Sequence, residues 1–175
     1  DVIDDVITEV RNGSLHIYTK KSNLFNFFNF GKATTRSAYV TVTDLKSIDA
    51  SSGSDVKSEN TLKGDALKVN SSSGSDVVLD VVYKNISLDA SSGADIKMSG
   101  KAKTVKASAS SGSDINARDL AASVCHANAS SGADVAVHAT DEIHANASSG
   151  GDVSYYGNPS VKNIDESSGG DVSAR

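Results

Sequence analysis

The stretch that decides the fold runs from Ser87 to Ile96 and reads Ser-Leu-Asp-Ala-Ser-Ser-Gly-Ala-Asp-Ile. Its last six residues are one copy of a hexapeptide, Ser-Ser-Gly-[Ser/Ala/Gly]-Asp-[Val/Ile], that occurs seven times. Successive copies are 21, 19, 19, 20, 18 and 19 residues apart. A near-constant short period is typical of a chain that winds one coil per repeat. The aspartates of the seven copies are Asp55, Asp76, Asp95, Asp114, Asp134, Asp152 and Asp171.

Residues around each aspartate alternate between apolar and polar side chains. The position one after it is always Val or Ile, the position five before is nearly always small, and the position seven before is always apolar. The positions between these are polar, so the period is two, as in half-buried strands. Stacking such strands every 19 residues places coils about 4.8 Å apart. The sequence therefore predicts an all-β fold, a right-handed parallel β-solenoid (β-helix) of about seven short turns.

Three further features follow from the same alignment. The glycine of every hexapeptide is expected to supply a corner with positive φ, which a β-carbon would oppose. The last copy is atypical, because Glu166 replaces the small residue and Lys162 replaces an apolar one. We expect these two residues to form a polar cap at the end of the stack. Cys125 falls in an inward column, which predicts a buried core cysteine and not a reactive one.

Residues 1–44 lie outside the repeat. Asn12-Gly13 followed by Ser14–Tyr18 predicts a turn leading into a strand, a β-hairpin-like segment. Ala38–Thr43 predicts another strand that leads into the first coil. We expect residues 1–44 to provide strands and an aromatic-rich excursion that pack on the solenoid of residues 45–175, which gives one structural domain overall.

The aromatic excursion contains all four phenylalanines of the chain, interleaved with asparagine. Three hypotheses fit it: a cover over the open end of the solenoid, an exposed patch that docks a second subunit or a ligand, or a disordered loop. The candidate residues for partner binding or oligomerisation are Phe25, Phe27, Phe28 and Phe30.

The composition of the chain argues against several classes of partner and segment. The formal net charge of −5 argues against a nucleic-acid or anionic-membrane partner. The longest apolar runs are far shorter than a transmembrane helix requires. Asp1–Asp5 do not resemble a signal peptide. One cysteine cannot form an internal disulfide framework.

The stacked aspartates are the most provocative candidate site. Like charges about 4.8 Å apart repel each other by about 1 kcal/mol or less per pair in water. Each carboxylate could accept backbone N–H bonds at its corner and bond neighbouring serine hydroxyls. Alternatively, the row could bind Ca²⁺, a cation that prefers carboxylate and carbonyl oxygens. The seven aspartates are therefore weak candidates for a metal site, and no cofactor is predicted.

Two histidines, His126 and His144, occupy one outward column on adjacent coils and should stack. Such a pair could bind Zn²⁺, but the same column also holds Ser47, Lys68, Ser87, Lys106 and Asn163, which supply no third ligand. A catalytic centre would need unlike groups converging in a cleft, whereas the aspartates are alike in every coil. No Gly-x-Ser-x-Gly motif occurs. We therefore expect no enzyme activity.

The residues quoted above, with three other segments, resemble a known family, the putative auto-transporter adhesin head domain or GIN domain, which is common in Bacteroidetes. The hexapeptide resembles that family's recurring Ser-Gly-x-Gly-[Asp/Asn]-[Val/Ile]. The other similar segments are Asn12–Ile17, Val40–Ile48 and Tyr155–Pro159. The resemblance implies an exported β-solenoid of the periplasm, outer membrane or cell surface, often a lipoprotein. It assigns no catalytic residues.

These observations predict a non-catalytic structural or adhesive module of the cell envelope. It would bind a glycan or a protein through stacked polar columns, and a homo-oligomer is plausible because open solenoid ends and the phenylalanine segment both favour association. The alternatives are a Ca²⁺-binding β-solenoid and, less favoured, a polysaccharide-active enzyme.

Overall fold

The computed structural model describes residues 6–19 and 36–175, which fall into two compact units with a boundary between Val42 and Thr43. The first unit contains an antiparallel hairpin of β1 (Val6–Arg11) and β2 (Ser14–Thr19). Asn12 and Gly13 connect the strands with φ of 50° and 79°. Two left-handed residues make a tight turn whose twist matches that of the strands, so the predicted turn and hairpin are confirmed.

The prediction of a strand over Ala38–Thr43 is wrong. These residues form no strand, and all of them are exposed, with Tyr39 at 84%. Alternating Val and Thr give a segment β propensity, but a strand exists only where backbone groups find a partner. Within the described residues, none pairs with this segment.

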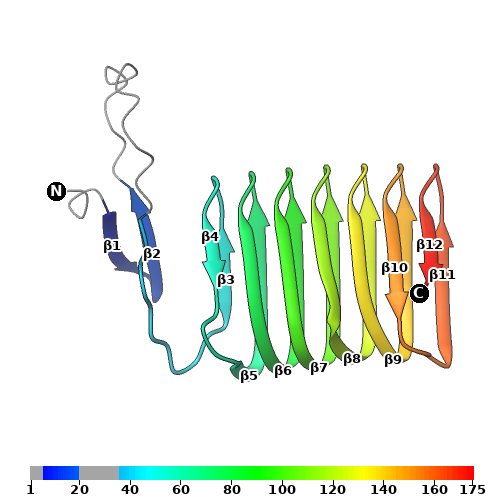
Figure 1. Cartoon of the computed structure of the whole chain (residues 1–175), viewed down its shortest axis with the longest axis horizontal. Helices are drawn as coiled ribbons and strands as arrows, with labels where there is room; N and C mark the ends of the chain where they lie inside the picture. Colours follow the sequence, from blue (N-terminus) through cyan, green and yellow to red (C-terminus); the bar gives the residue numbers. More distant parts are fainter. Residues whose placement is uncertain (1–5, 20–35) are drawn as a thin grey trace, which may run out of the picture. The chain divides into compact units, whose positions relative to one another are not determined.

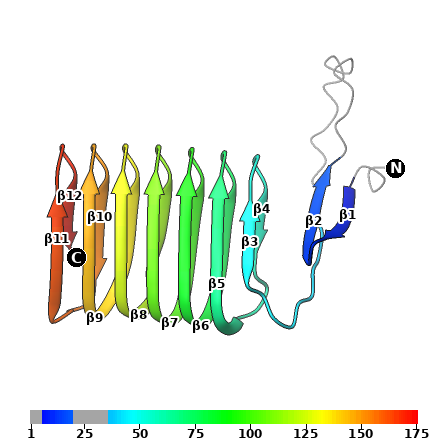
Figure 2. The same ribbon diagram turned by 180° about the vertical axis from the view of Figure 1, so that it is seen from behind.

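The second unit is a coiled parallel sheet of ten strands. The order along it is β12-β10-β9-β8-β7-β6-β5-β3, with β4 paired to β6 and β11 paired to β9. Figures 1 and 2 show flattened coils whose tight turns form a row along one edge. The strands are β3 (Ser47–Ala50), β4 (Asp55–Lys57), β5 (Leu62–Ser72), β6 (Asp76–Ser91), β7 (Asp95–Ser110), β8 (Asp114–Ser130), β9 (Asp134–Ser148), β10 (Asp152–Tyr156), β11 (Val161–Glu166) and β12 (Asp171–Ala174).

Each of the long strands β6 to β9 begins just after one Ser-Ser-Gly turn, bends at the opposite edge and ends at the next turn. Each coil therefore has two outer faces. We call the outward residues that precede a turn the pre-turn face, which carries β3 and β11, and those that follow it the post-turn face, which carries β4, β10 and β12. The post-turn face is toward the viewer in Figure 1 and the pre-turn face in Figure 2.

The register confirms that equivalent residues of successive coils stack. Asp55 pairs with Asp76, Asp76 with Asp95, and the series continues through Asp114, Asp134 and Asp152 to Asp171. The chain is thus a parallel β-solenoid of about seven turns, as predicted.

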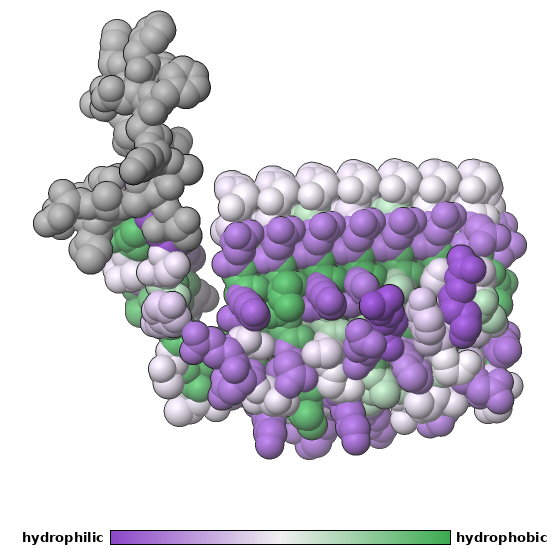
Figure 3. Space-filling model, viewed as in Figure 1, coloured by the Kyte–Doolittle hydropathy of each residue, from purple (hydrophilic) through white to green (hydrophobic). Residues whose placement is uncertain are grey.

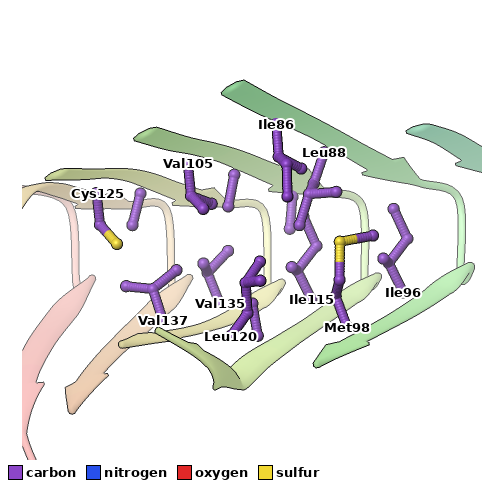
Figure 4. Packing of buried hydrophobic residues seen from close by; sticks show 14 of the residues in the cluster. Ile86, Leu88, Ile96, Met98, Val105, Ile115, Leu120, Cys125, Val135 and Val137 are labelled. Atoms are coloured by element: carbon purple, nitrogen blue, oxygen red, sulfur yellow. The ribbon is translucent and has the colours of Figure 1, made fainter. Parts of the chain in front are cut away.

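The core fills the space between the two faces. Figure 4 shows Ile86, Val105 and Cys125 on one side, pointing toward Met98 and Val137 on the other. All of these side chains are at most 2% exposed, and burying each large one contributes about 1.5–3 kcal/mol. Beside the turns the interior narrows, and the inward residues there are nearly all alanine. They are Ala50, Ala90, Ala109, Ala129 and Ala147, with Ser71 in the second coil.

The Ser-Ser-Gly turn uses two left-handed residues, not one. Gly112 has φ of 65°, as predicted for the glycine column, but Ser111 before it has φ of 58°, and the same holds in all seven turns. A left-handed L-residue costs about 1–2 kcal/mol. The conformation is retained because it joins the coils: the Gly112 N–H donates to the carbonyl of Ser131 in the next turn at 3.2 Å. The inter-coil ladder therefore continues through the corner.

A buried serine closes some of the turns from inside. Ser113 is fully buried, and its hydroxyl donates to the Ser110 carbonyl at 2.8 Å and accepts the Ser110 N–H at 3.1 Å. Ser75 does the same with Ser72. These bonds satisfy backbone groups that the tight corner removes from the ladder.

The last coil carries the two predicted polar substitutions. Glu166 accepts the backbone N–H of Val172 through Oε1 at 2.8 Å. The Lys162 ammonium lies 5.5 Å from the centre of the Tyr155 ring, in cation–π range. Both side chains therefore cover groups of the last two coils instead of entering the core.

We expect Gly112→Ala and Gly100→Ala to differ in cost. A β-carbon on Gly112 meets no atom within 4 Å, so only the left-handed conformation opposes it, at about 1–2 kcal/mol. A β-carbon on Gly100 would lie 1.9 Å from the Val81 carbonyl oxygen, so that coil must shift. Urea unfolding should show a loss for Gly100→Ala well above that for Gly112→Ala. Equal losses would mean that the bend is not closely packed.

Candidate functional site

The post-turn face presents the aspartate column. All seven side chains are exposed, and Figure 3 shows a hydrophilic row directly beneath the pale row of turns on this face. The register makes the aspartates the first outward residues after each turn. No hydrogen bond or ion pair joins any of these carboxylates to another described residue.

The expected ladder of hydrogen bonds to these carboxylates is therefore wrong, and the reason lies in the corner. The N–H of each column aspartate after the first is already used by the preceding coil; that of Asp95, for example, donates to the Ser75 carbonyl at 3.0 Å. The serine hydroxyls nearby turn inward to close their own turn, as Ser75 does. The carboxylates are left facing solvent.

The same exposure bears on the cation hypothesis. Among residues 6–19 and 36–175, no three His, Cys, Asp or Glu side chains converge into a group that could hold a metal ion. The aspartates form a line of single carboxylates about 4.8 Å apart, not a cage. Binding of Ca²⁺ by this line stays a prediction.

We expect Asp95→Asn to raise the melting temperature at low ionic strength. It removes repulsion from Asp76 and Asp114, each worth about 1 kcal/mol or less at this spacing in water. The gain should shrink with added salt, because the charges are exposed. Thermal unfolding with Ca²⁺ and with EDTA is the check. A lower melting temperature for Asp95→Asn, together with destabilisation of wild type by EDTA, would instead support a cation-binding column.

The pre-turn face carries two adjacent outward columns of polar residues. We call the one six residues before each aspartate the outer polar column and the one four residues before it the hydroxyl column. The outer polar column is Asp49, Asn70, Asp89, Ser108, Asn128, Asn146 and Asp165. The hydroxyl column is Ser51, Ser72, Ser91, Ser110, Ser130, Ser148 and Ser167. Asn70 donates to the Asp49 carboxylate, but Asp89, Ser108 and Asn128 have no side-chain hydrogen bond to a described residue.

A shallow depression, the polar groove, runs along these columns. It is lined by Asn70, Asp89, Ser108 and Asn128 of the outer polar column and by the hydroxyl column of the same coils. Ala90, Ala109 and Ser71 lie beneath them. The groove therefore offers hydrogen-bonding groups at a regular spacing of about 4.8 Å along the stacking axis. Sequence alignment located both columns but not the depression, because spacing does not reveal the relative heights of side chains.

A second depression lies on the same face, closer to the bend, and we call it the lysine depression. Its cationic lining residues are Lys46, Lys68 and Lys106. Polar Asn85, Ser87 and Thr104 and the apolar Leu67 and Ile86 complete most of the lining. Asp44 and Asp65 also contribute, but each carboxylate is held by a lysine. The hydrogen bond from Lys84 lowers the pKa of Asp65.

The predicted histidine stack is confirmed. The rings of His126 and His144 are 4.6 Å apart and nearly parallel, at 11°. His144 contacts Glu142 through Nε2 at 2.5 Å and Asn163 through Nδ1 at 3.1 Å, so both of its nitrogens have partners. Burial, followed by the charges of His144 and Lys106, lowers the pKa of His126. Because both nitrogens of His144 already contact protein groups, this arrangement disfavours metal ligation by the pair.

Cys125 is fully buried, as predicted, and burial raises the pKa of its thiol to about 12. Because only the thiolate is nucleophilic, this cysteine is inert in the folded protein. We expect no reaction with a thiol reagent at pH 8 until denaturant is added, followed by one equivalent of reaction. Labelling of the native protein at the rate of a free thiol would contradict the burial.

The four candidate phenylalanines, Phe25, Phe27, Phe28 and Phe30, lie outside the described residues, and their roles in partner binding or oligomerisation stay predictions. The packing of residues 1–44 on the solenoid stays a prediction too. No helix of the described residues is long and apolar enough to cross a membrane.

Comparison with known proteins identifies the family of this chain. The sequence profile of the family described as "Putative auto-transporter adhesin, head GIN domain" matches residues 1–159. The chain belongs to this family. The match includes six of the seven hexapeptides of the GIN domain and its Tyr-Tyr-Gly-Asn-Pro segment, Tyr155–Pro159. No curated protein matches the chain.

Solved structures share the fold. A putative adhesin from Bacteroides fragilis is 21% identical with a TM-score of 0.81, and the match covers 99% of this chain and 78% of that one. A putative lipid-binding protein from Parabacteroides distasonis is also 21% identical, with a TM-score of 0.66, over 98% and 80%. A putative adhesin from Parabacteroides merdae is 17% identical, with a TM-score of 0.57, over 99% and 79%. At these identities the likeness concerns the fold alone.

Proposed function

We propose that this GIN domain is an exported, non-catalytic adhesive module that binds a glycan along the polar groove of its pre-turn face. The observation that carries the proposal is the row formed by Asp89, Ser108 and Asn128, whose side chains face the groove without a partner among the described residues. Family membership supports an adhesive role at the cell surface.

The chemistry of the groove favours a glycan over a protein partner. Protein interfaces depend on buried aromatic and arginine anchors. The lining of the polar groove contains neither, and consists of hydroxyl, amide and carboxylate groups with small residues beneath. Sugars offer many hydroxyls that can donate to and accept from such groups. Because every coil repeats the same chemistry, an extended polymer could make equivalent contacts on several coils at once, and weak single contacts would add up.

The repetition also supports a non-catalytic role. General acid–base chemistry on a glycosidic bond needs two carboxyl groups placed on either side of it. The polar groove has a single carboxylate, Asp89, among its lining residues. The seven carboxylates of the aspartate column are equivalent and lie in a line, so none of them is distinguished from its neighbours by its surroundings.

We expect Ser108→Ala combined with Asn128→Ala to weaken binding to a responsive polysaccharide by about tenfold or more, since each lost hydrogen bond contributes about 0.5–1.5 kcal/mol. Screening immobilised polysaccharides with wild type identifies the ligand, and titration measures the loss. The control replaces Ser154 and Ser173, two residues after their column aspartates on the post-turn face, with alanine. If the control pair loses binding and the pre-turn pair keeps it, the groove is not the binding site.

A further inference from the structure

The lysine depression and the polar groove are parts of one continuous surface. Both are lined by the same three pre-turn strand segments, in β5, β6 and β7. Lys68 in the lysine depression and Asn70 in the polar groove both point outward. They are two residues apart, about 7 Å along the strand. A ligand that lies in the polar groove across these coils therefore extends beside the lysines.

Two lysines of the lysine depression carry a positive charge that no described acidic residue neutralises. Lys68 and Lys106 occupy the same column, two coils or about 10 Å apart, with Ser87 between them. Neither forms an ion pair with a described residue, whereas Lys46 is within 3.3 Å of the Asp44 carboxylate. Both side chains are exposed at the rim of a concave surface, where a bound anion could contact them together.

The net charge of the chain does not oppose this, because charge is unevenly distributed. Residues 43–106 contain nine lysines and nine acidic residues, whereas residues 107–175 contain three basic and nine acidic residues. Three of the nine acidic residues in the first group, Asp55, Asp76 and Asp95, belong to the post-turn column. The first coils are therefore close to neutral and the later coils are acidic, so an anion meets less overall repulsion at the first coils than at the later ones.

We propose that the lysine depression binds the anionic groups of an acidic polysaccharide whose hydroxyls occupy the polar groove. This inference rests on the proposed function and names its ligand class. Lys68 and Lys106 act as two point charges for carboxylate or sulfate groups on one edge of the polymer. The outer polar column then hydrogen-bonds the opposite edge, through Ser108 and Asn128.

Titration with three polysaccharides tests the assignment: polygalacturonate, which carries carboxylates, dextran sulfate, and neutral dextran. Lys68→Gln combined with Lys106→Gln should weaken binding of at least one acidic polymer by about tenfold or more at low salt. The matched control, Lys63→Gln with Lys101→Gln, removes the same charge from the same strands, β5 and β7, at positions that are also two coils apart but do not line the depression. It should change affinity by less than about twofold, as expected for exposed charges away from the ligand. Which acidic polymer binds distinguishes carboxylate from sulfate recognition.

The outcomes separate this inference from the proposed function. If both lysine pairs weaken binding equally, overall charge and not the depression attracts the polymer, and the inference is overturned. If neutral dextran binds as tightly as the acidic polymers, and Ser108→Ala with Asn128→Ala abolishes that binding, the inference fails while the proposed function stands. If none of the three polymers binds and the wider screen finds no other polysaccharide, both are overturned.

Discussion

The solenoid depends on backbone hydrogen bonding between successive coils, and in the first six coils this bonding continues through the corners. A tight corner normally removes backbone groups from a sheet. Here the left-handed Ser-Gly pair keeps the glycine N–H aimed at the next coil, as in Gly112 and Ser131. Because these corners are part of the ladder, the first six coils cannot slip by a residue without also losing hydrogen bonds at their turns. A one-residue slip would also exchange the inward and outward columns.

This fixed register turns a one-dimensional sequence pattern into two surfaces of different chemistry. The post-turn face displays a line of carboxylates that touch no described residue, and the pre-turn face displays amides, hydroxyls and, on its first coils, lysines. A single substitution changes one element of a column, not a unique site. Binding on such a surface should therefore depend on several equivalent positions at once.

Sequence reasoning succeeded where the hexapeptide constrains the backbone. The period predicted the stacking, the alternation placed Cys125 inside, and column alignment paired His126 with His144. It missed the left-handed serine, because serine rarely adopts that conformation, and the inter-coil bonds that accompany it at most of the turns cannot be seen in the sequence. It also predicted a strand over Ala38–Thr43, where propensity is strong but no described residue offers a partner.

The sequence predicted which residues of the candidate site share a column, but not the depression that they line. Lys68 and Lys106 could be assigned to one column from their spacing, yet the hollow that brings them beside Asn85 and Thr104 depends on side-chain heights. For the aspartate column the reverse holds. The alignment located all seven residues, but the hydrogen bonds predicted for their carboxylates are absent. They are absent because the backbone N–H groups at the corner already donate to carbonyls of neighbouring coils.

The variation in repeat length is taken up in the part of each coil that runs from the post-turn face to the bend opposite the turns. Register shifts occur between Lys97 and Ser99 and between Ala117 and Ala121, while the aspartates on either side stay aligned. Evolution can therefore lengthen or shorten this part of the coil without changing the spacing of the pre-turn columns. The same tolerance makes the bend a place where foreign peptides could be inserted for display on an otherwise unaltered scaffold.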